Sequence, residues 1–198
     1  MADDTGIQPC DPSLKPSAAW IHEFLRQFAQ LRRRLQREYE LTSGQAAAAP
    51  PGTHRLLLSQ AALEAAAAEE LAALQLDPPS AAMPELQQLR GLDQVQVRRQ
   101  LHAAIQSAVQ QEALAPEAAA SLYALSARMD KPLPAGTSAL YRDLLRCCAA
   151  QRAALGADGG GAAAAHPRLP HLNILIAVVG AYFGQDEELA GMWEGDEE

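Results

Sequence analysis

The stretch "HLNILIAVVGAYFGQDEEL" at residues 171–189 is the most continuously apolar part of the chain, and it turns abruptly acidic at its end. Its apolar run, residues 172–183, is too short for a membrane anchor, which needs about 20 apolar residues. A buried parallel strand is the alternative, but no other segment offers a strand to pair with it. Five apolar side chains recur at the spacing of one helical face: Leu172, Leu175, Ile176, Val179 and Phe183. The stretch therefore predicts a mostly buried terminal helix.

Asn173 is a polar exception inside this apolar run. Its amide could hydrogen-bond a loop carbonyl near the start of the helix, which would relieve the cost of burying it. It could instead fix the register of the helix within the domain or against a partner. We expect the first role.

The composition favours packing of helix on helix. The chain has 198 residues, enough for one domain with a core, and hydrophobic residues make up 48% while aromatic residues make up only 5%. No segment alternates as a strand would, and no long period repeats. We predict an all-α fold, an irregular helical bundle of about six or seven helices with flexible linkers and an acidic C-terminal tail.

Five segments follow from the helix signals. They are an irregular N-terminal segment (1–16), a long Trp-containing helix (17–40), a linker with an Ala-rich helix (41–83), a helical partner-binding domain (84–185) and an acidic tail (186–198). Ser17 is the predicted N-cap of the Trp-containing helix. Its apolar stripe consists of Ile21, Phe24, Phe28, Leu31 and Leu35.

The region 84–185 carries the most regular helix signals. Pro84 opens a short helix through Leu92, Asp93 caps the next one, Pro116 begins a third, and Thr137 caps a fourth. The stripe after Asp93 consists of Val97, Leu101, Ile105 and Ala108, and the stripe after Thr137 includes Leu140, Leu144 and Leu155. Cys147 and Cys148 are neighbours on a helix and point about 100° apart, so we expect at least one to be buried.

The charge distribution argues against nucleic acid as a partner. The net charge is −8, and seven acids lie in the last fourteen residues. The rest of the chain carries 16 basic and 17 acidic residues, so it offers no basic surface for direct, specific nucleic-acid binding. We expect the acidic end to be a solvated tail, with contact to a basic partner as the alternative.

No local motif points to an enzyme, a metal or a cofactor. The histidines show no metal-ligand spacing: His22, His54, His102, His166 and His171. The Gly run at 159–161 lacks the Lys of a phosphate loop. Three cysteines without framework spacing indicate a reducing compartment, and residues 1–10 lack the apolar core of a signal peptide. The expected setting is the cytoplasm or nucleus.

From the residues alone, each of two surface features has two interpretations. The run Arg32, Arg33 and Arg34 is either solvated helix surface or a protein contact. Tyr123, Tyr141 and Tyr182 lie off the strict apolar seams, so they either close the core or line a groove for a partner helix.

Several motifs together carry a family resemblance. In order they are Leu-Tyr-Ala-Leu (122–125), Asp-Lys-Pro-Leu (130–133), a helix with Leu, Arg and Cys (144–148), Leu-Asn-Ile-Leu-Ile (172–176) and Tyr-Phe-Gly-Gln (182–185). In order and spacing they resemble the survival-of-motor-neuron (SMN) interacting protein family, that of the second gem-associated protein. The resemblance covers residues 84–185 with good specificity and 14–40 with moderate specificity, while 41–83 does not match in detail.

The resemblance implies a non-catalytic assembly factor of the SMN complex. Family members bind an N-terminal helix of SMN and hold Sm core ring proteins during the biogenesis of spliceosomal ribonucleoproteins, and so serve mRNA processing and splicing. It implies a cytoplasmic and nuclear location that includes nuclear bodies, with no cofactor and no membrane. The alternative is a general helical adaptor in an unrelated complex.

This chain departs from the family pattern at two places. The family normally carries an N-terminal arm ahead of the Trp-containing helix, which wraps Sm subunits and helps to keep RNA out. Here residues 1–16 stand in its place, so we expect a short or N-terminally truncated form. Animal members have Arg-Trp before the Leu-Tyr pair, whereas this chain has Ala120 and Ser121, so apolar packing would have to hold the SMN helix.

The resemblance and the apolar stripes together give candidate contact residues. The candidates for the SMN-helix groove are Leu122, Tyr123, Leu125, Met129, Leu172, Leu175, Ile176, Val179 and Phe183. The candidates for contact with Sm proteins are Trp20, Arg26, Arg33 and Arg37.

Overall fold

A computed structural model describes residues 7–48, 89, 91–159, 164–191 and 193 of the chain. Six α-helices span Ala18–Ala48 (α1), Gln94–Val109 (α4), Pro116–Arg128 (α5), Ala135–Gly159 (α6), Leu169–Ile176 (α7) and Glu187–Ala190 (α8). A 3-10 turn, η1, spans Pro12–Leu14, and a π-helical segment, η3, spans Ala177–Tyr182. None of the described residues lies in a strand, which confirms the all-α prediction.

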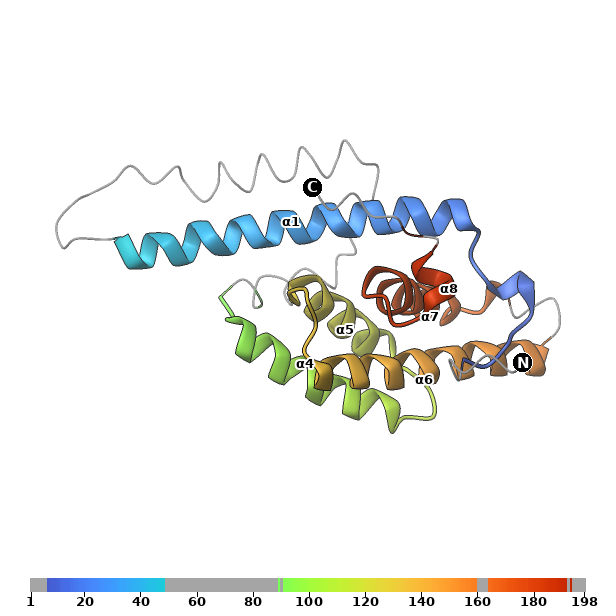
Figure 1. The fold of residues 1–198 in the computed structure, drawn as a ribbon. Helices are drawn as coiled ribbons and strands as arrows, with labels where there is room; N and C mark the ends of the chain where they lie inside the picture. The colour runs from blue at the N-terminus through green and yellow to red at the C-terminus, as the bar shows by residue number, and fades with distance from the viewer. Residues whose placement is uncertain (1–6, 49–88, 90, 160–163, 192, 194–198) are drawn as a thin grey trace.

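The helices pack in layers around a central pair. In Figure 1, α1 runs along one side of the molecule, α6 and α4 form the opposite side, and α7 and α8 lie between them. α5 packs against α1, α4 and α7, so α5 and α7 form the middle of the bundle. The end of α1 extends past the bundle (Figure 1).

α1 begins where its sequence predicts. Oγ of Ser17 accepts a hydrogen bond from the backbone N–H of Trp20 at 3.2 Å. The helix continues to Ala48, eight residues beyond the predicted end at Glu40. The Thr-Ser-Gly cluster after Leu41 is typical of a helix end, but the helix continues through it into an Ala run of high helix propensity.

The α4 start is fixed by a reciprocal capping box. Asp93 Oδ1 accepts from the backbone N–H of Gln96 at 2.7 Å, and Gln96 Oε1 accepts from the backbone N–H of Asp93 at 3.0 Å. The predicted stripe is fully buried: Val97, Leu101, Ile105 and Ala108. α5 begins at Pro116 as predicted.

α6 starts at Ala135, three residues before the predicted first helical residue, so Thr137 is not its N-cap. The backbone N–H groups of Thr137 and Ser138 both donate to the carbonyl of Pro134, which supplies the helix start. The Thr137 side chain is buried and its Oγ1 lies 2.9 Å from Nε2 of His102 on α4. Thr137 therefore links two helices. Cys148 is buried and Cys147 half-buried, which confirms the expectation for the pair.

The terminal apolar stretch is a buried helix, as predicted, but its second half is π-helical. The backbone N–H of Phe183 donates to the carbonyl of Val178, five residues back, at 3.0 Å. Gly180 lies in this segment, and a Cβ atom there would come within 2.7 Å of Cδ1 of Leu189. The absence of a side chain at Gly180 therefore allows α8 to pack closely against η3.

The first residue of the expected acidic tail belongs to the folded body. Asp186 is buried, and its Oδ1 accepts from the backbone N–H of Leu189 at 2.8 Å, which caps α8. Leu189 packs against the core from this helix. Residues 192 and 194–198 lie outside the described residues, as do 49–83, most of the predicted helix from Pro84, and His54.

The described helices include none that combines the length and apolar character needed to cross a membrane.

Candidate interaction surfaces

The apolar stripes predicted to form an SMN groove lie mostly inside the bundle. Tyr123 is partly exposed, whereas the other eight candidates are at most 6% exposed: Leu122, Leu125, Met129, Leu172, Leu175, Ile176, Val179 and Phe183. These eight side chains pack on the chain's own helices instead of lining an open groove. Which residues contact SMN stays a prediction.

The accessible side chains of the same two helices lie near their N-terminal ends. On α5 they include the exposed Pro116 and Glu117 and the half-buried Ala118 and Ser121. On α7 they are the exposed Pro170 and the half-buried His171 and Ile174. The two helices pack against each other, so a partner that reaches α5 and α7 meets mainly small and apolar side chains.

Tyr123 and Tyr182, whose roles the sequence left open, join α5 and η3 to α1. Phe28 contacts Tyr123 at a centroid distance of 5.4 Å and Tyr182 at 4.9 Å in an edge-on arrangement. Burial raises the pKa of Tyr123 to about 12, and it raises the pKa of the fully buried Tyr141 as well. Tyr123 and Tyr182 therefore help to close the core while keeping part of their surface exposed.

The outer face of α1 carries the candidates for Sm contact. Trp20 is 40% exposed and stacks on Phe24 at 4.9 Å. Arg26, Arg33 and Arg37 are exposed, and their spacing of seven and four residues places them on one side of the helix, opposite the buried stripe. The structure therefore brings the three arginines together, while Trp20 lies off their line.

Arg26 is engaged within α1. Its Nε and Nη2 donate to the two carboxylate oxygens of Glu23 at 2.9 and 2.7 Å. Hydrogen bonds from Arg26, followed by one from Gln27, lower the pKa of Glu23 to about 2. Because this pair is fully exposed, it contributes little to stability.

Arg32 lies on the inner side of α1 and fixes that helix to the bundle. Its Nη1 donates to the backbone carbonyl of Ser126 at 2.9 Å, near the C-terminal end of α5. Its guanidinium lies 5.2 Å from the ring centroids of both Tyr182 and Phe183. Arg32 comes four residues after Phe28, so the apolar spacing itself places it on the buried side, although its charge hides this in the sequence.

Arg128, which is buried, holds the end of α5. Its Nη2 donates to the carbonyl of Leu92 at 3.0 Å, and its guanidinium lies 4.7 Å from the ring centroid of Tyr39 on α1. Burial lowers the pKa of Arg128. The role of Arg128 could not be predicted from the sequence, because a lone Arg at a helix end carries no distinctive signal.

The buried polar groups serve structural contacts in the described residues. Within these ranges no group of three His, Cys, Asp or Glu side chains could hold a metal ion. Burial raises the pKa of the Cys148 thiol, which disfavours the reactive thiolate. The arrangement offers helical surfaces and aromatic contacts, which is what a protein partner would use.

Comparison with known families gives a match over most of the chain. The family described as Survival motor neuron (SMN) interacting protein 1 (SIP1) matches residues 1–186. A search of curated proteins finds no significant match.

Proposed function

The chain belongs to the SMN-interacting protein 1 family, and we propose that it binds SMN and Sm core proteins as a non-catalytic factor in the assembly of spliceosomal ribonucleoproteins. The family match over residues 1–186 is the observation that carries this proposal. The all-α fold supports it, since the described part of the molecule offers helix faces for contact. We propose that the protein acts in the cytoplasm and nucleus, including nuclear bodies.

We propose that Sm proteins contact the outer face of α1. Trp20 supplies exposed aromatic area, and Arg26, Arg33 and Arg37 supply three cations on one side. Aromatic and Arg side chains dominate the binding energy of many protein interfaces. The hydrogen bond from Arg32 to the Ser126 carbonyl holds α1 in one orientation. The outer face of α1 is therefore preorganised for a partner.

We propose that the SMN helix packs across the N-terminal halves of α5 and α7. Contact would be made by Ser121, Ala118, His171 and Ile174, with the buried stripe residues as the floor beneath them. Small side chains on α5 permit close approach of a second helix. This chain has Ala120 and Ser121 where an Arg-Trp pair would stand, so shape complementarity would replace an ion pair.

Measuring the binding of the purified chain to an N-terminal SMN peptide and to Sm proteins tests the proposed SMN contact and the proposed Sm contact. Ile174→Asp should weaken the SMN peptide about tenfold and leave Sm binding intact, because it places a charge in an apolar contact. The triple variant Arg26→Glu, Arg33→Glu, Arg37→Glu should weaken Sm binding and leave binding of the SMN peptide intact. Each variant is therefore the control for the other. Failure of the unaltered chain to bind either partner would refute the function, and binding of a different helical partner would favour a general adaptor.

A further inference from the structure

A short segment after η3 folds back over the place where α1 and η3 meet. The chain turns at Gly184, whose φ of +63° lies in the left-handed region, and continues into α8, which in Figure 1 lies directly below α1. We call residues 186–191 together with Trp193 the strap. Neither the SMN contact nor the Sm contact proposed above involves it.

The strap covers a small apolar cluster shared by α1 and η3, which we call the seam. Four side chains form the seam, each at most 5% exposed: Ile21 and Leu25 from α1, and Ala177 and Ala181 from η3. Leu189 and Trp193 of the strap pack against the seam. The ring of Trp193 also lies 5.6 Å from the ring of His22 on α1. The strap therefore contacts both helices that form the seam.

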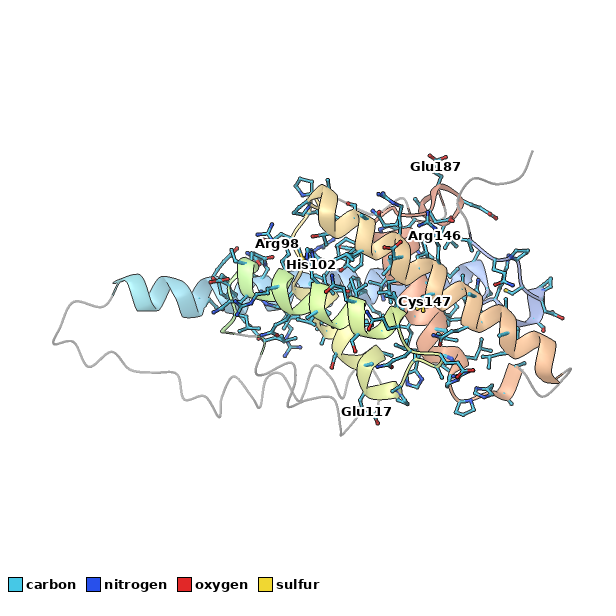
Figure 2. The ribbon with its side chains drawn as sticks, turned by 90° about the horizontal axis from the view of Figure 1, so that it is seen from below. Arg98, His102, Glu117, Arg146, Cys147 and Glu187 are labelled. Atoms are coloured by element: carbon cyan, nitrogen blue, oxygen red, sulfur yellow. The ribbon has the colours of Figure 1, made fainter. Side chains whose placement is uncertain are left out.

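The strap presents two apolar anchors in the manner of a short amphipathic helix. Leu189 and Trp193 are four residues apart, a spacing that places two side chains on one side of a helix. Glu187 and Glu188 are exposed, and Figure 2 shows Glu187 pointing away from the bundle. The strap thus shows which pattern the seam accepts: an aliphatic side chain, an aromatic one four residues later, and a polar outer side.

The fit of the strap is close at one anchor and open at the other. A Cβ atom at Gly180 would come within 2.7 Å of Cδ1 of Leu189, so η3 leaves just enough room for this side chain. Ala190 and Trp193, in contrast, line a cleft of about 510 Å³. The end of the strap that carries Trp193 therefore packs against the bundle on one side and faces open space on the other.

Backbone hydrogen bonds join the strap to the bundle at its start and then run within the strap. The backbone N–H of Asp186 donates to the carbonyl of Gly180 in η3 at 3.3 Å. The N–H groups of Leu189 and Ala190 donate to Asp186, and that of Gly191 donates to the carbonyl of Glu187. Because these later bonds are internal, the strap can lift from the seam as a unit and keep them.

We propose that the seam is a docking site for an amphipathic helix of a partner protein, and that the strap occupies this site until the partner displaces it. The partner helix places an aliphatic side chain where Leu189 lies and an aromatic one where Trp193 lies. These are the spaced anchors of helix-in-groove recognition. Because the strap is attached to the site that it covers, a helix gains the seam only by outcompeting it.

The test uses a model helix that shares the anchor pattern of the strap and little else of its sequence. The probe is the fluorescein-labelled, amidated peptide Ser-Ala-Glu-Leu-Lys-Gln-Ala-Trp-Lys-Ala-Lys, and the control peptide has Ala in place of its Leu and Trp. The anchor variant of the full chain carries Leu189→Ala with Trp193→Ala, which removes both anchors and keeps the backbone of the strap. Fluorescence anisotropy measures the affinity.

We expect the anchor variant to bind the probe at least about tenfold more tightly than the natural chain. A strap that is open in no more than about a tenth of the molecules weakens binding to the natural chain by that factor. Adding Ile21→Ala to the anchor variant changes the seam itself and should weaken the probe about tenfold.

The matched control removes two apolar side chains elsewhere. Val95 and Val109 are exposed on α4, and Val95→Ala with Val109→Ala should leave the affinity within about twofold of that of the natural chain. Circular dichroism confirms that each variant folds.

Hydrogen exchange of the natural chain gives a second readout that needs no substitution. We expect the backbone amides of Ala190 and Gly191 to exchange faster than those of Leu175 and Ile176 in α7, because the strap opens locally. An excess of the probe should speed the exchange of the strap amides further, since the probe displaces the strap from the seam.

The docking site is refuted if the natural chain and the anchor variant bind the probe equally, or if the control peptide binds as tightly as the probe. Strap amides that exchange only together with those of α7 would make the strap a fixed part of the bundle. A natural chain that dimerises, while the anchor variant stays monomeric, would assign the seam to the strap of a second copy instead.

Discussion

Asn173 accepts a hydrogen bond from the buried guanidinium of Arg152, with 3.0 Å between Oδ1 and Nη1. Its Nδ2 donates to the backbone carbonyl of Leu14, also at 3.0 Å. Arg152 is 6% exposed, its Nε has no partner, and no carboxylate contacts it among the described residues. The Asn173 amide therefore joins α6, α7 and the N-terminal segment. It accepts from Arg152 where a carboxylate partner would be expected for a buried cation.

Replacing Asn173 should be costly. Asn173→Leu leaves a buried charge without its acceptor and the Leu14 carbonyl without its donor, so we expect a loss of about 2–4 kcal/mol in the free energy of unfolding. Asn173→Asp keeps an acceptor for Arg152 and should lose less. Urea denaturation measures both, with the exposed change Gln106→Leu on α4 as the control. A loss below about 0.5 kcal/mol for Asn173→Leu, the range of ordinary surface changes, would contradict this network.

Replacing Arg32 should loosen α1. Arg32→Gln removes the hydrogen bond to the Ser126 carbonyl and the cation beside Tyr182 and Phe183, so we expect a loss of about 1–3 kcal/mol. Hydrogen exchange should rise along α1 before it rises in α4. Arg99→Gln, on the exposed face of α4, is the matched control. Uniform exchange across all helices would mean that Arg32 stabilises the bundle as a whole and not the docking of α1.

Gly180 and Leu189 should be energetically coupled. In the natural chain, Gly180→Ala should be neutral or destabilising, because the new Cβ lies 2.7 Å from Cδ1 of Leu189. In a Leu189→Ala background the clash is gone, so Ala should stabilise by about 0.5–1 kcal/mol through its helix propensity. A double-mutant cycle from thermal or urea unfolding measures the difference. The same effect of Gly180→Ala in both backgrounds would exclude the contact.

Stability should fall in alkali because of Tyr123. Its pKa is about 12 in the folded protein, against about 10 for an unfolded chain. Between these values the unfolded state releases the proton and the folded state keeps it, so the free energy of unfolding decreases as pH rises from about 10 to about 12. Tyr123→Phe should flatten this decrease. Urea unfolding at pH 8 and pH 11 checks it, and a difference between the two proteins that is unchanged with pH would contradict it.

Helix starts were predictable because local chemistry sets them. Asp93 and Ser17 satisfy backbone N–H groups within their own first turn, and this signal is written in consecutive residues. Thr137 is also a residue type that favours an N-cap, but it does not cap α6. Its hydroxyl forms a hydrogen bond with His102 on α4 instead. Only the folded structure shows whether such a side chain caps its own helix or bonds a neighbouring helix.

The burial of most candidate groove residues could not be predicted for a related reason. Periodicity shows that residues such as Leu125 and Ile176 share an apolar face, but it does not show what covers that face. Here the chain's own helices cover it. A cleft of about 510 Å³ could not be predicted either. It is lined by the turn at residues 131–133, by residues 181–185 and by Trp193, and the turn is distant in sequence from the other two.

The bond between Asn173 and Leu14 spans 159 positions, and it sets an order of events during synthesis. The ribosome makes α1 before the α7–η3 segment, so Ile21 and Leu25 cannot pack on Ala177 and Ala181 until that later segment has been synthesised. Throughout that interval the nascent chain exposes the inner side of α1, the longest of the described helices. We expect that exposed side to be the part of the chain most prone to aggregation during synthesis.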